Sequence, residues 1–192
     1  SGNHAAAVSL AAALHRIPAF VVMPRNASRV KRAAVEGYGG EVIECEPTHA
    51  DRERTAAEVV ARTGATLIHP FDDASVIAGQ GTAALELLQE VPDLDVILTP
   101  IGGGGLISGT CLAVEACGSS TVVWGAEPTG ADDAARSKQS GRRVSIDRPV
   151  SIADGLLAGI GELTWPFVRD RVSRIVTVDD TQIAMAMRWV WE

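Results

Sequence analysis

An α/β fold with parallel sheets is the fold class that this sequence predicts, and three observations support it. Short apolar runs rich in β-branched residues alternate with longer amphipathic runs, hydrophobic residues make up 46% of the 192 residues, and glycine-rich turns separate some of the runs. Strands that alternate with helices form βαβ units, whose sheets are parallel and carry helices on both faces. We therefore expect parallel sheets covered on both sides.

The expected elements follow one another in a regular order. The predicted strands are 18–24, 41–45, 66–70, 95–100, 121–128 and 174–180. The predicted helices are 4–16, 28–37, 51–63, 76–90, 106–117 and 180–192. The segment 129–163 has only a weak pattern, and a long irregular stretch in a compact α/β protein is either functional or mobile.

Composition excludes several classes of function. The formal net charge is -7 and no basic run is present, so nucleic acid and anionic membranes are not expected partners. No apolar stretch approaches the ~20 residues needed to span a bilayer. The three cysteines show no CxxC spacing. Reduced, mostly buried thiols in a cytoplasmic protein are therefore expected.

Four consecutive glycines, 102–105, stand between the predicted strand 95–100 and the predicted helix 106–117. They let the backbone approach a ligand closely, and the helix start offers unpaired N–H groups and the positive end of its dipole, which favours a phosphate. A flexible connector is the alternative. The lysine of a Walker loop is absent, and the dinucleotide pattern G-x-G-x-x-G does not fit. Glu127, about 20 residues on, keeps a nicotinamide alternative open.

The opening "SGNH" lies at the start of the first predicted helix. Ser1 or Asn3 is expected to cap that helix. The same backbone amides could hold a substrate carboxylate, and Asn3 could donate to a cofactor oxygen.

Several stretches together resemble the fold-type II pyridoxal-phosphate (PLP) enzymes, a tryptophan synthase β-like fold, and most of all the serine racemase and serine/threonine dehydratase group. The stretches are "SGNHAAAVSLAAALHRIPAFVVMP", "VEGYGGEVIECEPTHADRE", "HPFDDASVIAGQGTAALELL", "PIGGGGLISG", "AEPTGADDAARSK", "IADG" and "TWPFVRDRV". They cover nearly the whole chain in the order of the family.

The resemblance implies a set of site residues. The PLP phosphate cradle is matched by Gly102, Gly103, Gly104, Gly105 and the amide of Leu106. Asn3 matches the asparagine that bonds the pyridoxal 3-hydroxyl, and it adjoins the substrate. Ser1 matches the serine that acts as the second acid/base in racemases. His4 and the amides around it match the substrate-carboxylate loop, and Arg52 matches an arginine that can reach the substrate carboxylate.

A divalent-cation site is also implied. Glu127, the backbone carbonyl of Ala131 and Asp133 match its ligands, and three oxygen ligands plus waters suit Mg²⁺ or Ca²⁺. The alternative is that Glu127 and Asp133 are solvated loop acids.

The Schiff-base lysine of the family lies upstream of the Ser-Gly-Asn loop. This sequence contains only Lys31 and Lys138, and neither matches that lysine. We therefore expect a fragment that lacks both ends and is inactive alone. Its expected parts are a small αβ subdomain, residues 1–72, and a partial large PLP-binding subdomain, residues 73–192.

The implied activity is dehydration and deamination of L-threonine, L-serine or a hydroxyaspartate to a 2-keto acid and ammonia. Serine racemase is the first alternative, because Ser1 supplies a hydroxyl. A nicotinamide oxidoreductase domain and a non-catalytic ligand-sensing domain are alternatives of other classes. The expected partners are a small amino-acid substrate and a second copy of the protein.

Overall fold

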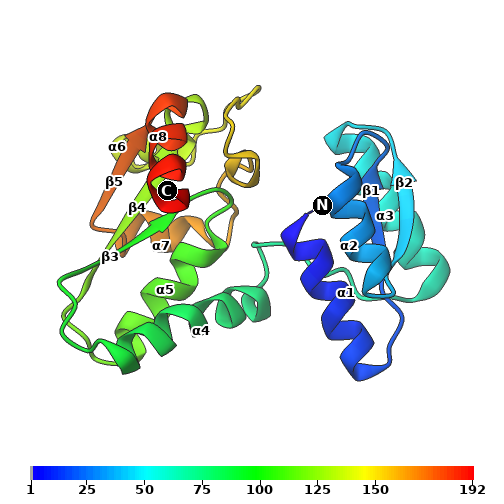
Figure 1. Cartoon of the computed structure of the whole chain (residues 1–192), viewed down its shortest axis with the longest axis horizontal. Coiled ribbons are helices and arrows are strands. Elements are labelled where there is room, and N and C mark those ends of the chain that lie inside the picture. Colours follow the sequence, from blue (N-terminus) through cyan, green and yellow to red (C-terminus); the bar gives the residue numbers. More distant parts are fainter. Residues whose placement is uncertain (1) are drawn as a thin grey trace. The chain divides into compact units, whose positions relative to one another are not determined.

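The computed structural model describes residues 2–192, apart from the side chain of His49. The chain divides into two compact units, residues 1–68 and 69–192 (Figure 1). Every pairing of strands within them is parallel. The predicted α/β fold class with parallel sheets is therefore confirmed.

The first unit is a pair of strands packed with three helices. Its elements are α1 (Asn3–His15), β1 (Phe20–Pro24), α2 (Arg29–Gly37), β2 (Glu41–Cys45) and α3 (His49–Thr63). The strands lie between α2 and α3 (Figure 1). Ala5, Val21, Met23 and Val35 form the core of the unit.

The glycine-rich turn before β2 has a packing role. Gly39 has a φ of 80°, which favours glycine, and a Cβ on Gly40 would lie 2.3 Å from the Ser9 Oγ of α1. The turn therefore brings the start of β2 against α1 in a way that no larger residue allows.

The second unit contains a three-stranded parallel sheet in the order β3-β4-β5. Its elements are α4 (Ala74–Glu90), β3 (Val96–Pro100), α5 (Gly105–Ala116), β4 (Val122–Pro128), α6 (Asp133–Ser140), α7 (Trp165–Asp170), β5 (Arg174–Val178) and α8 (Asp180–Trp191). Two short 3-10 turns lie at Thr129–Ala131 and Asp154–Leu156. The core of the unit is formed by Ile101, Ile107, Cys111, Val123, Ala134, Ile160, Val168 and Val172.

Helices α4 and α5 touch through their backbones. A Cβ on Gly81 would lie 2.7 Å from the Gly109 carbonyl oxygen, and a Cβ on Gly109 would lie 2.5 Å from the Gly81 nitrogen. This close packing fixes α5, whose first residue follows the glycine-rich loop.

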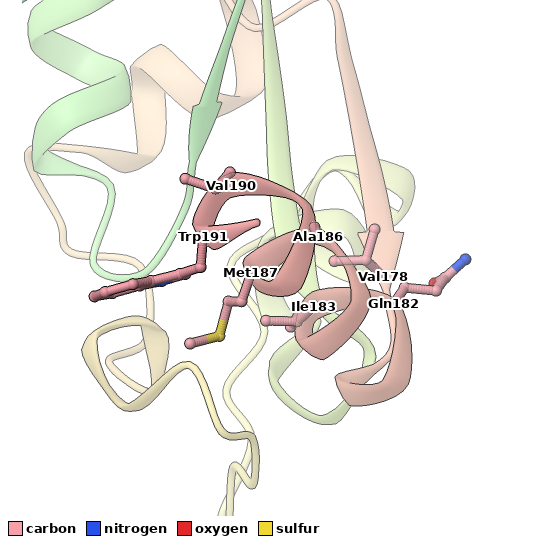
Figure 2. A pocket seen from close by; sticks show the side chains of 7 residues that line it. All are labelled: Val178, Gln182, Ile183, Ala186, Met187, Val190 and Trp191. Carbon is pink, nitrogen blue, oxygen red and sulfur yellow. The ribbon is translucent and has the colours of Figure 1, made fainter.

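In contrast to α4 and α5, helix α8 has no buried side chain. Together with Val178 it lines an apolar hollow, in which Gln182 is the polar residue (Figure 2). The hollow contains no titratable side chain and so offers no acid, base or nucleophile. No helix in the described part of the chain is long and apolar enough to cross a membrane.

Two sequence-based expectations about elements are wrong. Residues 66–70 form no strand, since a strand requires a hydrogen-bonded neighbour and none pairs with them among residues 2–192. The segment 129–163 is less irregular than expected, because it contains α6, and α7 follows soon after it.

Candidate active site

The residues expected to form the site belong to both units. Asn3, His4 and Arg52 lie in the first unit, and the glycines 102–105 and the expected cation ligands lie in the second. Ser1 lies outside the residues that the structure describes.

The opening loop begins α1 in a way that the sequence did not predict. The N-cap is Gly2, with φ 102° and ψ -136°, and no side chain caps the helix there. This backbone conformation is nearly restricted to glycine. Asn3 is the first helical residue, so the expectation that it caps the helix is wrong. Its side chain is exposed, and no described group hydrogen-bonds it. It is therefore free to bind a ligand.

The two other candidates of the first unit differ in their contacts. His4 Nε2 lies 3.1 Å from the carbonyl oxygen of Ile68, within hydrogen-bond distance. Arg52 forms no ion pair with any described residue, and its buried Nε has no acceptor there. A buried guanidinium nitrogen without a partner is costly, so an anionic ligand at Arg52 would offset that cost.

The loop 102–104 connects β3 to α5 at the carboxyl end of the sheet, where α/β proteins bind ligands. No described group accepts a hydrogen bond from the N–H groups of residues 102–106. Unpaired amides at the start of a helix, together with the helix dipole, form an anion site.

Two of these glycines face α4 and the loop that precedes it. A Cβ on Gly103 would lie 2.3 Å from Cγ of Phe71, and a Cβ on Gly105 would lie 2.8 Å from Nε2 of Gln80. The Gly105 position would also meet Cβ of Phe71 at 2.9 Å, so a side chain at either glycine would have to displace Phe71. The aromatic ring therefore lies directly against the backbone of the loop.

The other two glycines face the segment before α7. A Cβ on Gly102 would lie 3.1 Å from Cα of Leu156, and a Cβ on Gly104 would lie 2.8 Å from Cβ of Thr164. Gly104 also has a φ of 89°. Gly103 and Gly104 are therefore required by their surroundings, and Gly102 and Gly105 have little space for a side chain, which argues against a flexible connector. Phe71 and Thr164 were not predicted as site residues from the sequence, although they lie in the motifs "HPFDD" and "TWP".

The expected cation ligands lie where β4 ends. Glu127 is 1% exposed, and its carboxylate accepts hydrogen bonds from the amides of Ala134 (3.2 Å) and Ala135 (2.6 Å) at the start of α6. Asp133 is 5% exposed and accepts from the amide of Ile160 at 3.0 Å. Both acids are buried, so the alternative of solvated loop acids is wrong.

Burial raises the pKa of Glu127 to about 7, opposed by the hydrogen bond from Ala135 and reinforced by the charge of Asp133. Burial likewise raises the pKa of Asp133. Among residues 2–192 no three His, Cys, Asp or Glu side chains gather. Each carboxylate oxygen has two lone pairs, so one remains after an amide bond. Glu127 and Asp133 are thus two buried carboxylates, and carboxylate oxygens are ligands that a hard divalent cation takes.

Other assignments lose support from these contacts. Glu127 is almost fully buried within its own unit, beneath the start of α6, so it is not presented to a ribose as the nicotinamide alternative requires. Lys138 Nζ donates to the carbonyls of Val168 (3.3 Å) and Arg169 (3.1 Å), near the end of α7. Cations stabilise helix C-termini, so this lysine has a structural role.

A glycine loop at the start of a helix, at the carboxyl end of a parallel sheet, is the arrangement in which α/β proteins bind phosphorylated ligands. The family described as "Pyridoxal-phosphate dependent enzyme" matches residues 1–192. The chain belongs to this family, which confirms the resemblance inferred from the sequence.

Three proteins of known activity are similar to the chain over its whole length. The β-hydroxyaspartate dehydratase of Paracoccus denitrificans (strain Pd 1222) is 50% identical, and the match covers 61% of that protein. The structure of maize serine racemase has a TM-score of 0.98 at 50% identity, with 58% of it covered. The structure of the T.th. threonine deaminase has a TM-score of 0.94 at 43% identity, with 63% of it covered. The chain thus spans about 60% of these relatives.

Proposed function

We propose that the chain is part of a PLP-dependent dehydratase that converts L-threonine, L-serine or a hydroxyaspartate to a 2-keto acid and ammonia. The observation that carries the proposal is the glycine cradle, whose amides at residues 102–106 have no described acceptor. Family membership supports PLP as the ligand of that cradle. Similarity to a β-hydroxyaspartate dehydratase and a threonine deaminase supports the reaction.

Different residues of the chain would bind different parts of the cofactor. The amides of Gly102, Gly103, Gly104, Gly105 and Leu106 would hold the phosphate, and the helix dipole of α5 would favour its charge. Asn3, exposed at the start of α1, would bond the 3-hydroxyl of the cofactor ring. The bound cofactor supplies the electron sink that makes the α-proton of an amino acid removable.

Substrate binding would use the remaining candidates. The amides around His4 would hold the substrate carboxylate, and the hydrogen bond of His4 to the Ile68 carbonyl would fix the imidazole. Arg52 would add its unpaired guanidinium. Neither Lys31 nor Lys138 is proposed as the base for the α-proton.

Serine racemase is the second candidate, because the maize enzyme is 50% identical to the chain. The two reactions differ after the α-proton has left. In the dehydratase the β-hydroxyl leaves as water, and a returning water releases ammonia. In the racemase Ser1 would return a proton to the opposite face. We rank elimination first, with measurable racemisation of serine beside it.

We further propose that Glu127, Ala131 and Asp133 hold Mg²⁺ or Ca²⁺. A homodimer and a cytoplasmic location are also proposed, and they follow from the family resemblance alone.

The function is tested in a PLP-loaded enzyme that contains this chain. We would incubate it with L-serine, L-threonine and β-hydroxyaspartate, quantify the keto acid, and resolve D-serine by chiral chromatography. Keto acid should be the main product. Ser1→Ala should abolish D-serine while largely sparing elimination. D-serine without keto acid would make the enzyme a racemase, and D-serine at the wild-type rate from the variant would reduce Ser1 to a loop residue.

A further inference from the structure

The Gly103–Gly104 peptide is held from one side. Thr164 Oγ1 donates to the Gly103 carbonyl at 2.7 Å, and the amide of Gly161 lies 3.2 Å from the same oxygen. The Gly161 amide also donates to Thr164 Oγ1 at 2.9 Å. Thr164 is fully buried, so its hydroxyl has no water to replace these partners.

This arrangement sets the direction of the next amide. No peptide bond in the described residues is cis, and in a trans peptide the C=O and N–H groups point in opposite directions. With the Gly103 carbonyl bound to Thr164, the N–H of Gly104 points away from that residue and is unpaired. A flipped peptide would turn the carbonyl to the ligand side and leave the buried Thr164 hydroxyl without its acceptor.

The turn that carries Thr164 is itself anchored by Asp72. The Asp72 carboxylate accepts from the amide of Leu163 at 2.8 Å and from that of Glu162 at 3.0 Å. The backbone amide of Asp72 donates to His69 Nδ1 at 2.9 Å. A Cβ on Gly161 would lie 2.2 Å from Asp72 Oδ1. Turn 161–164 is thus bound closely to the segment 69–72.

We propose that Thr164 and Asp72 are positioning residues for the cofactor phosphate: Thr164 orients the Gly103–Gly104 peptide, and Asp72 holds Thr164 in place. The inference rests on the proposed function, since it requires the phosphate to bind at residues 102–106. Neither side chain needs to touch the cofactor. Their effect should therefore fall on the phosphate and leave the pyridine ring's own contacts unchanged.

The test compares two ligands of the apoenzyme that contains this chain. Dissociation constants are measured for PLP and for pyridoxal, which lacks the phosphate, and their ratio reports the contribution of the phosphate. Thr164→Val removes the hydroxyl at nearly constant volume, and Thr164→Ser retains it. Asp72→Asn replaces one of the two accepting oxygens by a donor.

Matched controls come from the same region. Thr110→Val removes a buried hydroxyl that bonds the Leu106 carbonyl at 2.9 Å within α5. Asp73→Asn changes the residue that caps α4, and asparagine caps helices equally well. Both controls should leave the ratio at its wild-type value, even where the melting temperature moves.

In Thr164→Val and Asp72→Asn the selectivity for PLP over pyridoxal should fall about tenfold, which corresponds to about 1.4 kcal/mol. Thr164→Ser should restore it. An unchanged ratio in Thr164→Val, or an equal loss for both ligands, would overturn the inference. If Thr164→Val does not fold, Asp72→Asn decides by the same criterion. A wild-type enzyme that binds PLP no better than pyridoxal would refute the phosphate site itself.

Discussion

Replacing Gly103 by alanine should both destabilise the second unit and weaken PLP binding. The added Cβ would lie 2.3 Å from Cγ of Phe71 and 2.4 Å from Cδ1 and Cδ2. Carbon atoms in ordinary contact are about 3.5–4.0 Å apart, so the ring and the loop must separate by about 1 Å or more. The ring has little freedom to move, because it packs edge-on against His69 and Asp72 beside it is anchored.

The loss of stability in Gly103→Ala can be worked out from the cost of overpacking a tight contact. Such insertions cost about 1–3 kcal/mol, and we take about 2 kcal/mol. In a protein of this size 1 kcal/mol shifts the melting temperature by about 2–4 °C. Gly103→Ala should therefore lower it by about 4–8 °C.

Thermal melts followed by circular dichroism, together with PLP titrations, measure both effects. The matched control is Gly79→Ala: Gly79 lies inside α4, with nothing within 4 Å of an added Cβ. Alanine is favoured over glycine in a helix by about 1 kcal/mol, so this variant should melt about 2–4 °C higher. If Gly103→Ala melts like the wild type and binds PLP equally well, the cradle is assigned to the wrong loop.

Two further predictions concern the cation and the cysteines. Mg²⁺ or Ca²⁺ at a hundredfold excess over its dissociation constant should stabilise the enzyme by about 2.7 kcal/mol, and Glu127→Gln should abolish this gain; equal melting with cation and with chelator would reject the site. At pH 8 a thiol reagent should modify exposed Cys117 but not Cys111, whose pKa burial raises to about 11. Mass spectrometry of the labelled peptides decides, and rapid labelling of Cys111 in the folded protein would contradict the packing described for α5.

Local patterns predicted most of the elements. The run "EVIEC" coincides with β2. The predicted helix 76–90 corresponds to α4, whose N-cap Asp73 accepts from the amides of Ser75 and Val76. Helix α6 was missed because its first amides are bound by Glu127, a residue of β4. The one local signal was Gly141, which ends α6 in the left-handed conformation.

The candidate site, too, was predictable from the sequence only in part. The glycine loop and its place before α5 were predictable, because a strand, a glycine run and a helix follow one another in the sequence. The reasons why each position must be glycine were not, since Phe71 and Thr164 come from distant segments. The same holds for Glu127, whose burial depends on α6.

The backbone contact between α4 and α5 limits how this protein can be varied. At Gly81 and Gly109 the obstacle to a larger residue is main-chain atoms of the opposite helix, so no change of a neighbouring side chain can make room. No second substitution can therefore compensate for a larger residue at either position. A mutational library aimed at altered substrate choice would lose every member that changes either glycine, while Gly37 and Gly79, which have open space and an ordinary φ, accept a wide range of residues.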